Sequence, residues 1–291
     1  MAKLRIGYIG IGLMGLPMVR HLKARGYAVT AYDIAPARCA EAAADGIAIA
    51  PSAAAAARGA EIVCLNLPTT ESVEDVMFLG GDVASTMTNS QVLVDFSTIV
   101  VEKGRAFAAR LQETAGAGWV DAPVSGGPPA AGTGTLTVMA GGRPQDIEAV
   151  RPLMADVAQR FTPMGPSGAG LVAKMLNQMI VGCLHAVLAE SLIVAEKAGI
   201  DAARLPECLA GGHADGSLLQ RLYPRMAARD FAPQGYARQL LKDLEMVSAF
   251  TAGLKAPTPM TGEALNLYRI LAHLGHTELD TSALVKVYDR A

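Results

Sequence analysis

The sequence predicts a two-part α/β protein, in which a doubly wound parallel sheet is followed by an all-α region. Over the first half of the chain, apolar segments of strand length alternate with helical patterns. An unusually long helical pattern then covers about 168–198, and after it no strand pattern appears. We therefore expect one domain at residues 1–164 and an all-helical domain at 165–291 that includes this inter-domain helix.

Composition supports two cores and a small soluble partner. The chain has 291 residues, of which 51% are hydrophobic and 18% charged, which is enough to fill two cores. The formal net charge is −2 and no Lys/Arg run is present, so we expect no nucleic-acid or membrane partner. The cysteines are widely spaced without a metal-binding pattern, which predicts core thiols and no metal site. They are Cys39, Cys64, Cys183 and Cys208.

The long helical pattern also has the length of a membrane span. However, residues 169–188 include Lys174, Asn177, Gln178 and His185. The N-terminal residues lead directly into a strand pattern, which leaves no room for a signal peptide. We expect a cytoplasmic protein.

The first motif is a strand, a glycine-rich turn and a helix, at residues 4–9, 10–15 and 16–23. Gly10 would make the turn, Gly12 would let the backbone approach a pyrophosphate, and Gly15 would let helix and strand pack closely. A glycine pattern alone is a weak signal, but this context favours dinucleotide binding. The predicted contacts are Gly10, Gly12, Leu13, Met14 and Gly15.

Asp33 follows a second strand at 28–32, at roughly the spacing of an acid that binds the adenosine ribose. Such an acid accepts hydrogen bonds from both ribose hydroxyls and repels a 2′-phosphate, so NAD is the expected cofactor. NADP is not excluded, because Arg38 in the next helix could bind that phosphate. The alternative for Asp33 is a helix N-cap before Pro36.

The alternation continues with helices at 36–44 and 51–57, strands at 61–67 and 91–96, a helix beginning at 70 and another at 101–114. Leu67, Pro68 and Thr98 end strands at the carboxyl edge, where an open parallel sheet binds its ligand. They are expected to contact the cofactor. For Thr98, a helix cap is an equal alternative.

Ser125, Gly126 and Gly127 could form an anion site. Their successive backbone N–H groups and one hydroxyl suit a carboxylate, although a hairpin turn would also explain the glycines. A loop rich in proline and glycine is expected at 128–134, followed by a strand at 136–140. A helix at 146–157 and a strand at 160–163 should complete the first domain.

The long helix begins at a glycine-rich segment and carries Lys174 in its second turn, with Asn177 and Gln178 on the same face. A lysine in a helix built for burial indicates a site, although its stem could pack while its head reaches water. Gly199 should end this helix, and further helices are expected at 236–253 and 261–274.

Beyond the long helix, Asp201 and Ser217 are expected to cap the helices that follow them. Lys242 and Asp243 lie inside an apolar run. On spacing alone, a surface salt bridge is as good an interpretation of this pair as a functional role.

Taken together, these motifs resemble the β-hydroxyacid dehydrogenase family, which includes 3-hydroxyisobutyrate dehydrogenase and tartronate semialdehyde reductase. The resemblance covers essentially the whole chain and rests on residues 10–15, 121–127, 165–177 and 242–244 in the family's order. It implies a Rossmann-type first domain, and a homodimer or homotetramer in which the long helix contributes to the interface. It also implies cofactor contacts at Leu67, Pro68, Thr98 and Lys242.

The resemblance further implies hydride transfer between the nicotinamide and the carbon bearing the β-hydroxyl. Lys174 would move the hydroxyl proton, Asn177 would hold the substrate or orient the lysine, and Ser125, Gly126 and Gly127 would bind the carboxylate. The expected substrate is a small hydroxyacid of the 3-hydroxyisobutyrate type. The alternatives are tartronate semialdehyde reduction and a non-catalytic cofactor-binding module of the same fold.

Overall fold

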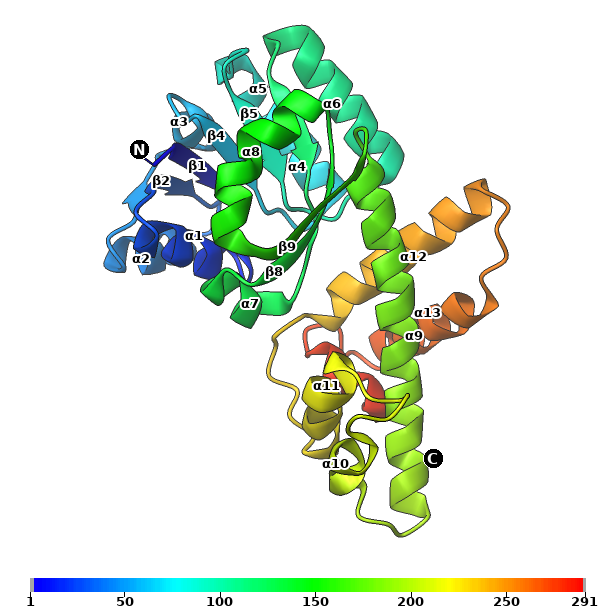
Figure 1. The fold of residues 1–291 in the computed structure, drawn as a ribbon. Coiled ribbons are helices and arrows are strands. Elements are labelled where there is room, and N and C mark those ends of the chain that lie inside the picture. The colour runs from blue at the N-terminus through cyan, green and yellow to red at the C-terminus, as the bar shows by residue number, and fades with distance from the viewer. Residues whose placement is uncertain (1–2, 290–291) are drawn as a thin grey trace. The chain divides into compact units, whose positions relative to one another are not determined.

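The computed structural model describes residues 3–289, and the chain divides into two compact units, Met1–Lys174 and Met175–Ala291 (Figure 1). The division lies inside the long helix α9 (Ala169–Lys197). The sequence pattern places the boundary before this helix, at 164/165, and the domain limits stay a prediction.

The first unit is built on a nine-stranded sheet with the order β3-β2-β1-β4-β5-β6-β8-β7, in which β9 pairs with β8. Strands β1 to β6 pair in parallel, and β8 runs antiparallel to β6 and β7. The chain order reverses between β1 and β4, which is where doubly wound sheets bind ligands. The strands are Arg5–Ile9, Ala28–Tyr32, Ala48–Ile49, Ile62–Leu65, Val92–Asp95, Gly118–Asp121, Val124–Ser125, Leu136–Gly141 and Ala158–Gly165.

Helices connect most of these strands, and side chains from the helices share one core with the sheet. Leu22 of α1 and Val150 of α8 are fully buried with Tyr8 of β1 and Val138 of β8. This packing confirms the predicted fold class. The helices of this unit are Gly15–Ala24 (α1), Pro36–Ala44 (α2), Ala53–Ala57 (α3), Thr70–Phe78 (α4), Val83–Thr86 (α5), Val101–Ala115 (α6), Gly127–Thr133 (α7) and Pro144–Val157 (α8).

Helix α7 corrects one prediction, because a loop is expected at 128–134. Pro128 and Pro129 lie in its first turn, where the missing N–H removes no intrahelical hydrogen bond and the fixed φ suits a helix. Gly134 ends the helix with a φ of 68° in the left-handed region. The prolines and the glycine therefore delimit a short helix.

In the described residues of the second unit the regular elements are all helices, apart from one isolated β-bridge between Tyr236 and Asp280. Its buried apolar side chains include Leu192, Leu222, Leu244 and Leu271, each from a different helix. Besides the C-terminal part of α9, it contains Ala202–Arg204 (η1), Leu205–Leu209 (α10), Ser217–Ala227 (α11), Ala237–Gly253 (α12), Pro259–His273 (α13) and Thr281–Val287 (η2).

Some details of this unit confirm the predictions and others differ from them. Gly199 follows α9 with a φ of 74°, as a helix-ending glycine should. Ser217 is the first residue of α11 rather than its cap, because Gly216 takes the cap position. Asp201 takes the cap position of η1 but makes no side-chain cap hydrogen bond. The prediction of four core thiols is wrong for three of the cysteines, because Cys208 is exposed, Cys39 and Cys183 are half-buried, and only Cys64 is fully buried.

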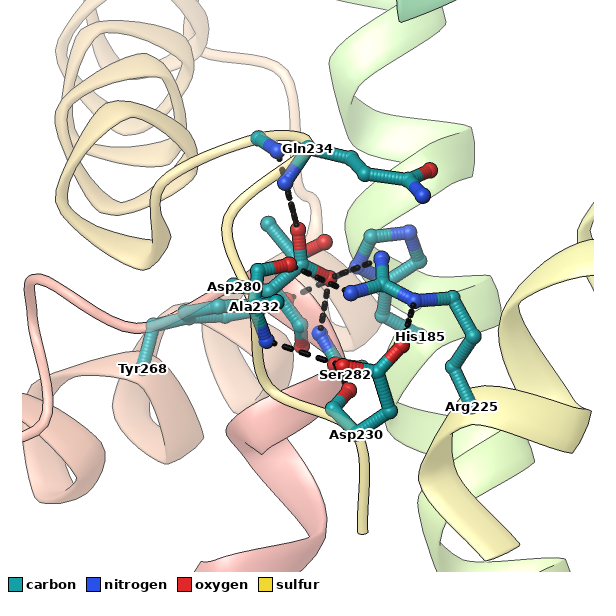
Figure 2. Close-up of polar contacts among 10 residues, drawn as sticks. His185, Arg225, Asp230, Ala232, Gln234, Tyr268, Asp280 and Ser282 are labelled. Atoms are coloured by element: carbon teal, nitrogen blue, oxygen red, sulfur yellow. Dashed lines mark hydrogen bonds and ion pairs between the residues drawn. The ribbon is translucent and has the colours of Figure 1, made fainter. Parts of the chain in front are cut away.

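A buried carboxylate, Asp280, fixes the C-terminal segment of the second unit (Figure 2). It is 1% exposed and accepts hydrogen bonds from the backbone N–H groups of Gln234, Gly235 and Ser282 at 2.7, 2.9 and 3.0 Å. The guanidinium of Arg225 donates to it at 2.9 Å. Asp280 thereby joins the start of η2 to the loop that precedes α12.

His185 and Tyr268 form a second buried contact near this network, with 2.8 Å between the histidine Nδ1 and the tyrosine hydroxyl (Figure 2). Burial lowers the pKa of His185 to about 4, although the charge of Asp280 opposes this. His185 is therefore neutral at physiological pH and serves the packing of α9 against α13.

Replacing Asp280 with Ala should strongly destabilise the second unit, since the Arg225 guanidinium would lose its buried partner and the N–H groups their acceptor. Breaking one side of a buried ion pair costs roughly 3–5 kcal/mol. Urea unfolding of Asp280→Ala measures this loss. Glu278→Ala is the control, because the Glu278–Arg238 pair is exposed and should be worth less than about 1 kcal/mol. Similar losses in the two variants would refute the anchoring role.

Candidate active site

The glycine turn after β1 has a different steric constraint at each glycine. Gly10 has a φ of +93°, and a Cβ there would lie 2.4 Å from the carbonyl oxygen of Asn66. A Cβ at Gly15 would lie 2.0 Å from the carbonyl oxygen of Gly10, so helix α1 approaches the turn too closely for a side chain. At Gly12 no atom lies within 4 Å of such a Cβ, which leaves that side of the turn open to a ligand. Leu13 and Met14, between Gly12 and Gly15, are half-buried.

Asp33 lies against this turn at the end of β2. Its Oδ2 accepts a hydrogen bond from the N–H of Ile11 at 2.8 Å, and its Oδ1 accepts one from Ala35, also at 2.8 Å. Ala35 holds the cap position of α2, so the N-cap alternative for Asp33 is wrong. Each carboxylate oxygen can accept a further hydrogen bond. The guanidinium of Arg38 is engaged by Glu41 in the same helix at 3.0 Å.

The ends of β4 and β5 meet beside this turn at the carboxyl edge of the sheet. The N–H of Leu67 donates to the hydroxyl of Ser97 at 2.9 Å, which links the two strand ends. Pro68 is exposed and Thr98 is half-buried. Val100, not Thr98, holds the cap position of α6, so the cap alternative for Thr98 is wrong. The cofactor contacts proposed from the sequence in this unit therefore share one edge.

Asp121, at the end of β6, anchors the start of helix α9. It is 2% exposed, and its two oxygens accept hydrogen bonds from the N–H groups of Gly168 and Leu171 at 2.7 and 3.0 Å. These N–H groups have no intrahelical acceptor, so the carboxylate satisfies donors that would otherwise be buried unpaired. Burial raises the pKa of Asp121 to about 6, while the hydrogen bonds from Gly168 and Leu171 oppose the rise.

Two glycines make room for this carboxylate. A Cβ at Gly141 would lie 2.7 Å from Asp121 Oδ2, and one at Gly170 would lie 2.9 Å from it. No real Cβ approaches that closely, so the carboxylate and the two glycines form one closely packed joint between the sheet and α9. No local pattern in the sequence indicates this joint.

The position of Lys174, in the second turn of α9, follows from this anchor. Its side chain is 8% exposed, and its Nζ donates a hydrogen bond to the backbone carbonyl of Val124 at 2.8 Å. The ammonium is thus held inside the first unit, so the alternative in which it reaches water is wrong. Val124 directly precedes Ser125, Gly126 and Gly127, so the lysine lies beside the segment expected to bind a carboxylate.

The segment formed by Ser125, Gly126 and Gly127 lies where β7 leads into α7, and all three residues are half-buried. Gly126 and Gly127 have φ values of 131° and 70°, which favour glycine, and a Cβ at Gly126 would lie 2.6 Å from that of Ala130. A hairpin turn does not explain these glycines, because a helix rather than a strand follows them. Carboxylate binding by this segment stays a prediction.

The remaining predicted residues lie in the second unit, where they are linked. Asn177 Nδ2 donates to Gln178 Oε1 at 2.7 Å, and Gln178 Nε2 donates to Asp243 Oδ2 at 2.6 Å. The Nζ of Lys242 lies 3.1 Å from Asp243 Oδ1. Asp243 is only 6% exposed, so a surface salt bridge is the wrong interpretation of this pair. The Gln178–Asp243 contact was not predicted, because its signal in the sequence is no more than a polar residue in each of two apolar helices.

Neither a metal site nor a membrane span accounts for these polar groups. Between residues 3 and 289, no group of three or more His, Cys, Asp or Glu side chains could hold a metal ion. Helix α9 has the length and composition of a membrane span. However, it buries Lys174, Gln178 and His185, and its Ala189 and Leu192 belong to the second core. It is a core helix of a soluble protein.

Two family models match the chain. Residues 5–165 match the NAD-binding domain of 6-phosphogluconate dehydrogenase, and residues 168–288 match the NAD-binding domain of NADP-dependent 3-hydroxyisobutyrate dehydrogenase. Together they cover both units.

Curated relatives and solved structures agree with these models. The chain is 31% identical to an NAD-dependent L-serine dehydrogenase of Pseudomonas aeruginosa, over 98% of each chain. It is 32% identical to a 2-hydroxy-3-oxopropionate reductase of Escherichia coli, over 98% of this chain and 97% of the relative. Among solved structures, a 3-hydroxyisobutyrate dehydrogenase of Mycobacterium tuberculosis with L-serine matches 99% of each chain, with a TM-score of 0.86 and 30% identity.

The anchor at Asp121 predicts a pH dependence of stability. Its folded pKa of about 6 is above the ordinary value of 3.8, so its contribution to stability is fully present below pH 4 and is lost as the pH rises through 6. The unfolding free energy of the wild type relative to Asp121→Asn should therefore fall between pH 4 and pH 7, by up to about 3 kcal/mol. Urea unfolding at both pH values measures this. A difference that is constant or grows with pH would show that burial does not dominate this group.

Proposed function

The chain belongs to the β-hydroxyacid dehydrogenase family, and we propose that it interconverts a short β-hydroxyacid and its semialdehyde with NAD, using Lys174 as general acid and base. Membership makes it an NAD(P)-dependent oxidoreductase that acts on a hydroxyl group. The observation that carries the proposed roles is the position of Lys174, buried and bonded to Val124 beside Ser125, Gly126 and Gly127.

A nicotinamide held at this edge would supply the acceptor for a hydride from the carbon that bears the β-hydroxyl, and the hydride donor in the reverse direction. Lys174 handles the accompanying proton. In oxidation its neutral amine accepts the hydroxyl proton at Nζ, and in reduction its ammonium donates one. The Val124 carbonyl holds the Nζ in place.

The substrate carboxylate would bind at Ser125, Gly126 and Gly127, through the serine hydroxyl and successive backbone N–H groups. Holding the carboxylate fixes the distance from the substrate hydroxyl to Lys174, which is how a positioned site lowers the barrier. Asn177 lies on the same helix and would hold the substrate or orient the lysine.

The residues of the glycine turn fit a dinucleotide. The open backbone at Gly12 would receive the pyrophosphate, and Asp33 would accept hydrogen bonds from the adenosine ribose. Leu13, Met14, Leu67, Pro68 and Thr98 would contact the rest of the cofactor, together with Lys242 of the second unit. NAD is the proposed form, because Asp33 repels a 2′-phosphate and Arg38 is paired with Glu41.

A short acid of the 3-hydroxyisobutyrate type is the proposed substrate. The relatives in Escherichia coli and Pseudomonas aeruginosa are named for a reductase of 2-hydroxy-3-oxopropionate and a dehydrogenase of L-serine, which share a carboxylate and an oxygen on the β-carbon. Reduction of 2-hydroxy-3-oxopropionate is the second candidate, given the 32% identity to that reductase. The retained Lys174 argues against a non-catalytic module.

We also propose a homodimer or homotetramer that uses helix α9, in keeping with the exposed apolar side chains along it. Five of them are 42 to 66% exposed, which is unusual for one helix of a soluble protein. They are Leu176, Ile180, Leu184, Val187 and Val194.

Removing the proton-transfer group should abolish most turnover. Lys174→Ala is expected to lower kcat by ~10²–10⁴-fold while cofactor binding stays nearly intact, because the predicted cofactor contacts do not include Lys174. The measurement is absorbance at the nicotinamide band with a panel of short hydroxyacids, plus NADH titration. The exposed Lys197 of the same helix supplies the control, Lys197→Ala, which should keep full activity. A folded Lys174→Ala variant that keeps more than about a tenth of kcat would reject the assignment.

Asp33 should set the cofactor preference. The wild type is expected to have a higher kcat/KM with NAD than with NADP, and Asp33→Ala should narrow the gap by losing the ribose contact and the repulsion of the 2′-phosphate. Arg38→Ala is the matched variant, and should leave the preference unchanged because Glu41 already occupies the guanidinium. Equal or better efficiency of the wild type with NADP would contradict the proposal.

Ser125 should matter most for substrates that carry a free carboxylate. A hydrogen bond to a charged group is worth roughly 1.5–3 kcal/mol, so Ser125→Ala should lower kcat/KM for 3-hydroxyisobutyrate or glycerate by about ten-fold or more. The corresponding methyl esters should lose much less. Comparing wild type and variant on acid and ester separates the two roles, since equal losses would mean that Ser125 only shapes the segment.

A further inference from the structure

Asn177, Gln178 and Asp243 form a chain of hydrogen bonds in the second unit, and we refer to it as the amide chain. The first two residues lie on α9 and the third on α12. Gln178 and Asp243 are 8% and 6% exposed, and the contacts measure 2.7 Å and 2.6 Å. The ammonium of Lys242 lies 3.1 Å from the second oxygen of Asp243 and compensates its charge. One end of the amide chain is therefore Asn177, which has a proposed function, and the other end pairs with Lys242, a proposed cofactor contact.

The chemistry of the carboxylate fixes the direction of every bond in the chain. An ionised carboxylate only accepts hydrogen bonds, so Gln178 must turn its Nε2 toward Asp243. Its Oε1 then faces Asn177, which must meet this acceptor with its Nδ2. The Oδ1 of Asn177 consequently points away from Gln178. Side-chain amides otherwise have two nearly equivalent orientations, but a buried carboxylate at the end of the chain removes one of them.

We propose that Asp243 is a positioning residue that acts through Gln178 to hold Asn177 as a hydrogen-bond acceptor on the face of α9 that carries Lys174. Asp243 and Gln178 need not touch the substrate for this role. They set which atom of Asn177 is presented, and Lys174 is three residues earlier on the same helix face.

The consequence for the reaction rests on the proposed function. An Asn177 Oδ1 can accept a hydrogen bond from an N–H of Lys174, which leaves the amine lone pair for the substrate hydroxyl in oxidation. It can also accept from the hydroxyl of the hydroxyacid. It cannot bind the carbonyl oxygen of the semialdehyde, because both are acceptors. If the side-chain amide of Asn177 were flipped, its NH₂ group would face the N–H donors of Lys174, and two donors form no hydrogen bond.

The test first removes the carboxylate at position 243 and then restores one at position 178, on the other side of the Gln178–Asp243 contact. Asp243→Asn has the same shape, but its amide can offer either atom to Gln178, so the orientation of Asn177 is no longer fixed. We expect kcat for oxidation of a short β-hydroxyacid to fall about ten-fold or more. In the double variant Asp243→Asn/Gln178→Glu, the carboxylate introduced at position 178 accepts from both neighbours. Asn177 is then held as in the wild type, and kcat should recover to within about three-fold of it.

The KM for NAD separates this role from a simple partnership with Lys242. Neither variant has a carboxylate at position 243. If Asp243 acted only as the ion-pair partner of Lys242, both variants would therefore have a raised KM for NAD, and kcat would not recover in the double variant. That pattern would overturn the proposal, as would an unchanged kcat in Asp243→Asn. Should Asp243→Asn not fold, Gln178→Met keeps the Asp243–Lys242 pair and must show the same loss of kcat.

Hydrogen exchange of the side-chain amides tests the positioning role without requiring catalytic activity. The side-chain amide protons of Gln178 and Asn177 should exchange slowly by NMR in the wild type and rapidly in Asp243→Asn. If the wild type oxidises no β-hydroxyacid, the proposed function fails and this exchange still decides the positioning role. Equal exchange in both proteins would refute it.

Discussion

The hydrogen bonds between Asp121 and the first turn of helix α9 are the constraint on which the first unit's site depends. They join the end of a central strand to the start of the long helix, at 2.7 and 3.0 Å. Because the start of α9 is fixed, Lys174 in its second turn is placed against the carbonyl of Val124, just past the strand that carries Asp121. The anchor and the proposed carboxylate segment thus belong to one continuous stretch of chain. Gly141 and Gly170 belong to the same joint, since a side chain at either position would displace the Asp121 carboxylate.

Asp121, Asp243 and Asp280 are buried aspartates that all accept hydrogen bonds from buried donors. They differ in whether their partners include a residue with a proposed role. Each accepts from donors that would otherwise be unpaired, and each is 6% exposed or less. Asp280 has the most partners, yet they include no residue with a proposed site role. A buried and fully bonded acid is therefore not by itself a sign of a site. What distinguishes Asp121 and Asp243 is that each is bonded to helix α9, which carries the two residues proposed to move the proton and to hold the substrate.

Much of the fold could be predicted from the sequence because its signals are local. The strand–glycine–helix motif and the long helix are readable from spacing, and the glycines at 10 and 15 meet real steric limits. Helix α7 was not predictable in this way, since prolines favour a loop except in the first turn of a helix. The contacts of Asp121 and Asp243 join residues 47 to 65 positions apart, so no pattern along the chain shows them. Lys174 was recognisable from the sequence as a candidate site residue, but its hydrogen-bond partner Val124 was not.

The central claim is that Lys174 moves the hydroxyl proton of an acid whose carboxylate is held at Ser125, Gly126 and Gly127. A crystal structure of the protein with NAD and a short β-hydroxyacid tests it most directly. The account predicts the lysine Nζ within hydrogen-bond distance of the substrate hydroxyl, and the carboxylate on the hydroxyl and N–H groups of those residues. A substrate bound with its carboxylate toward Lys174, or with its hydroxyl out of reach of the Nζ, would contradict it.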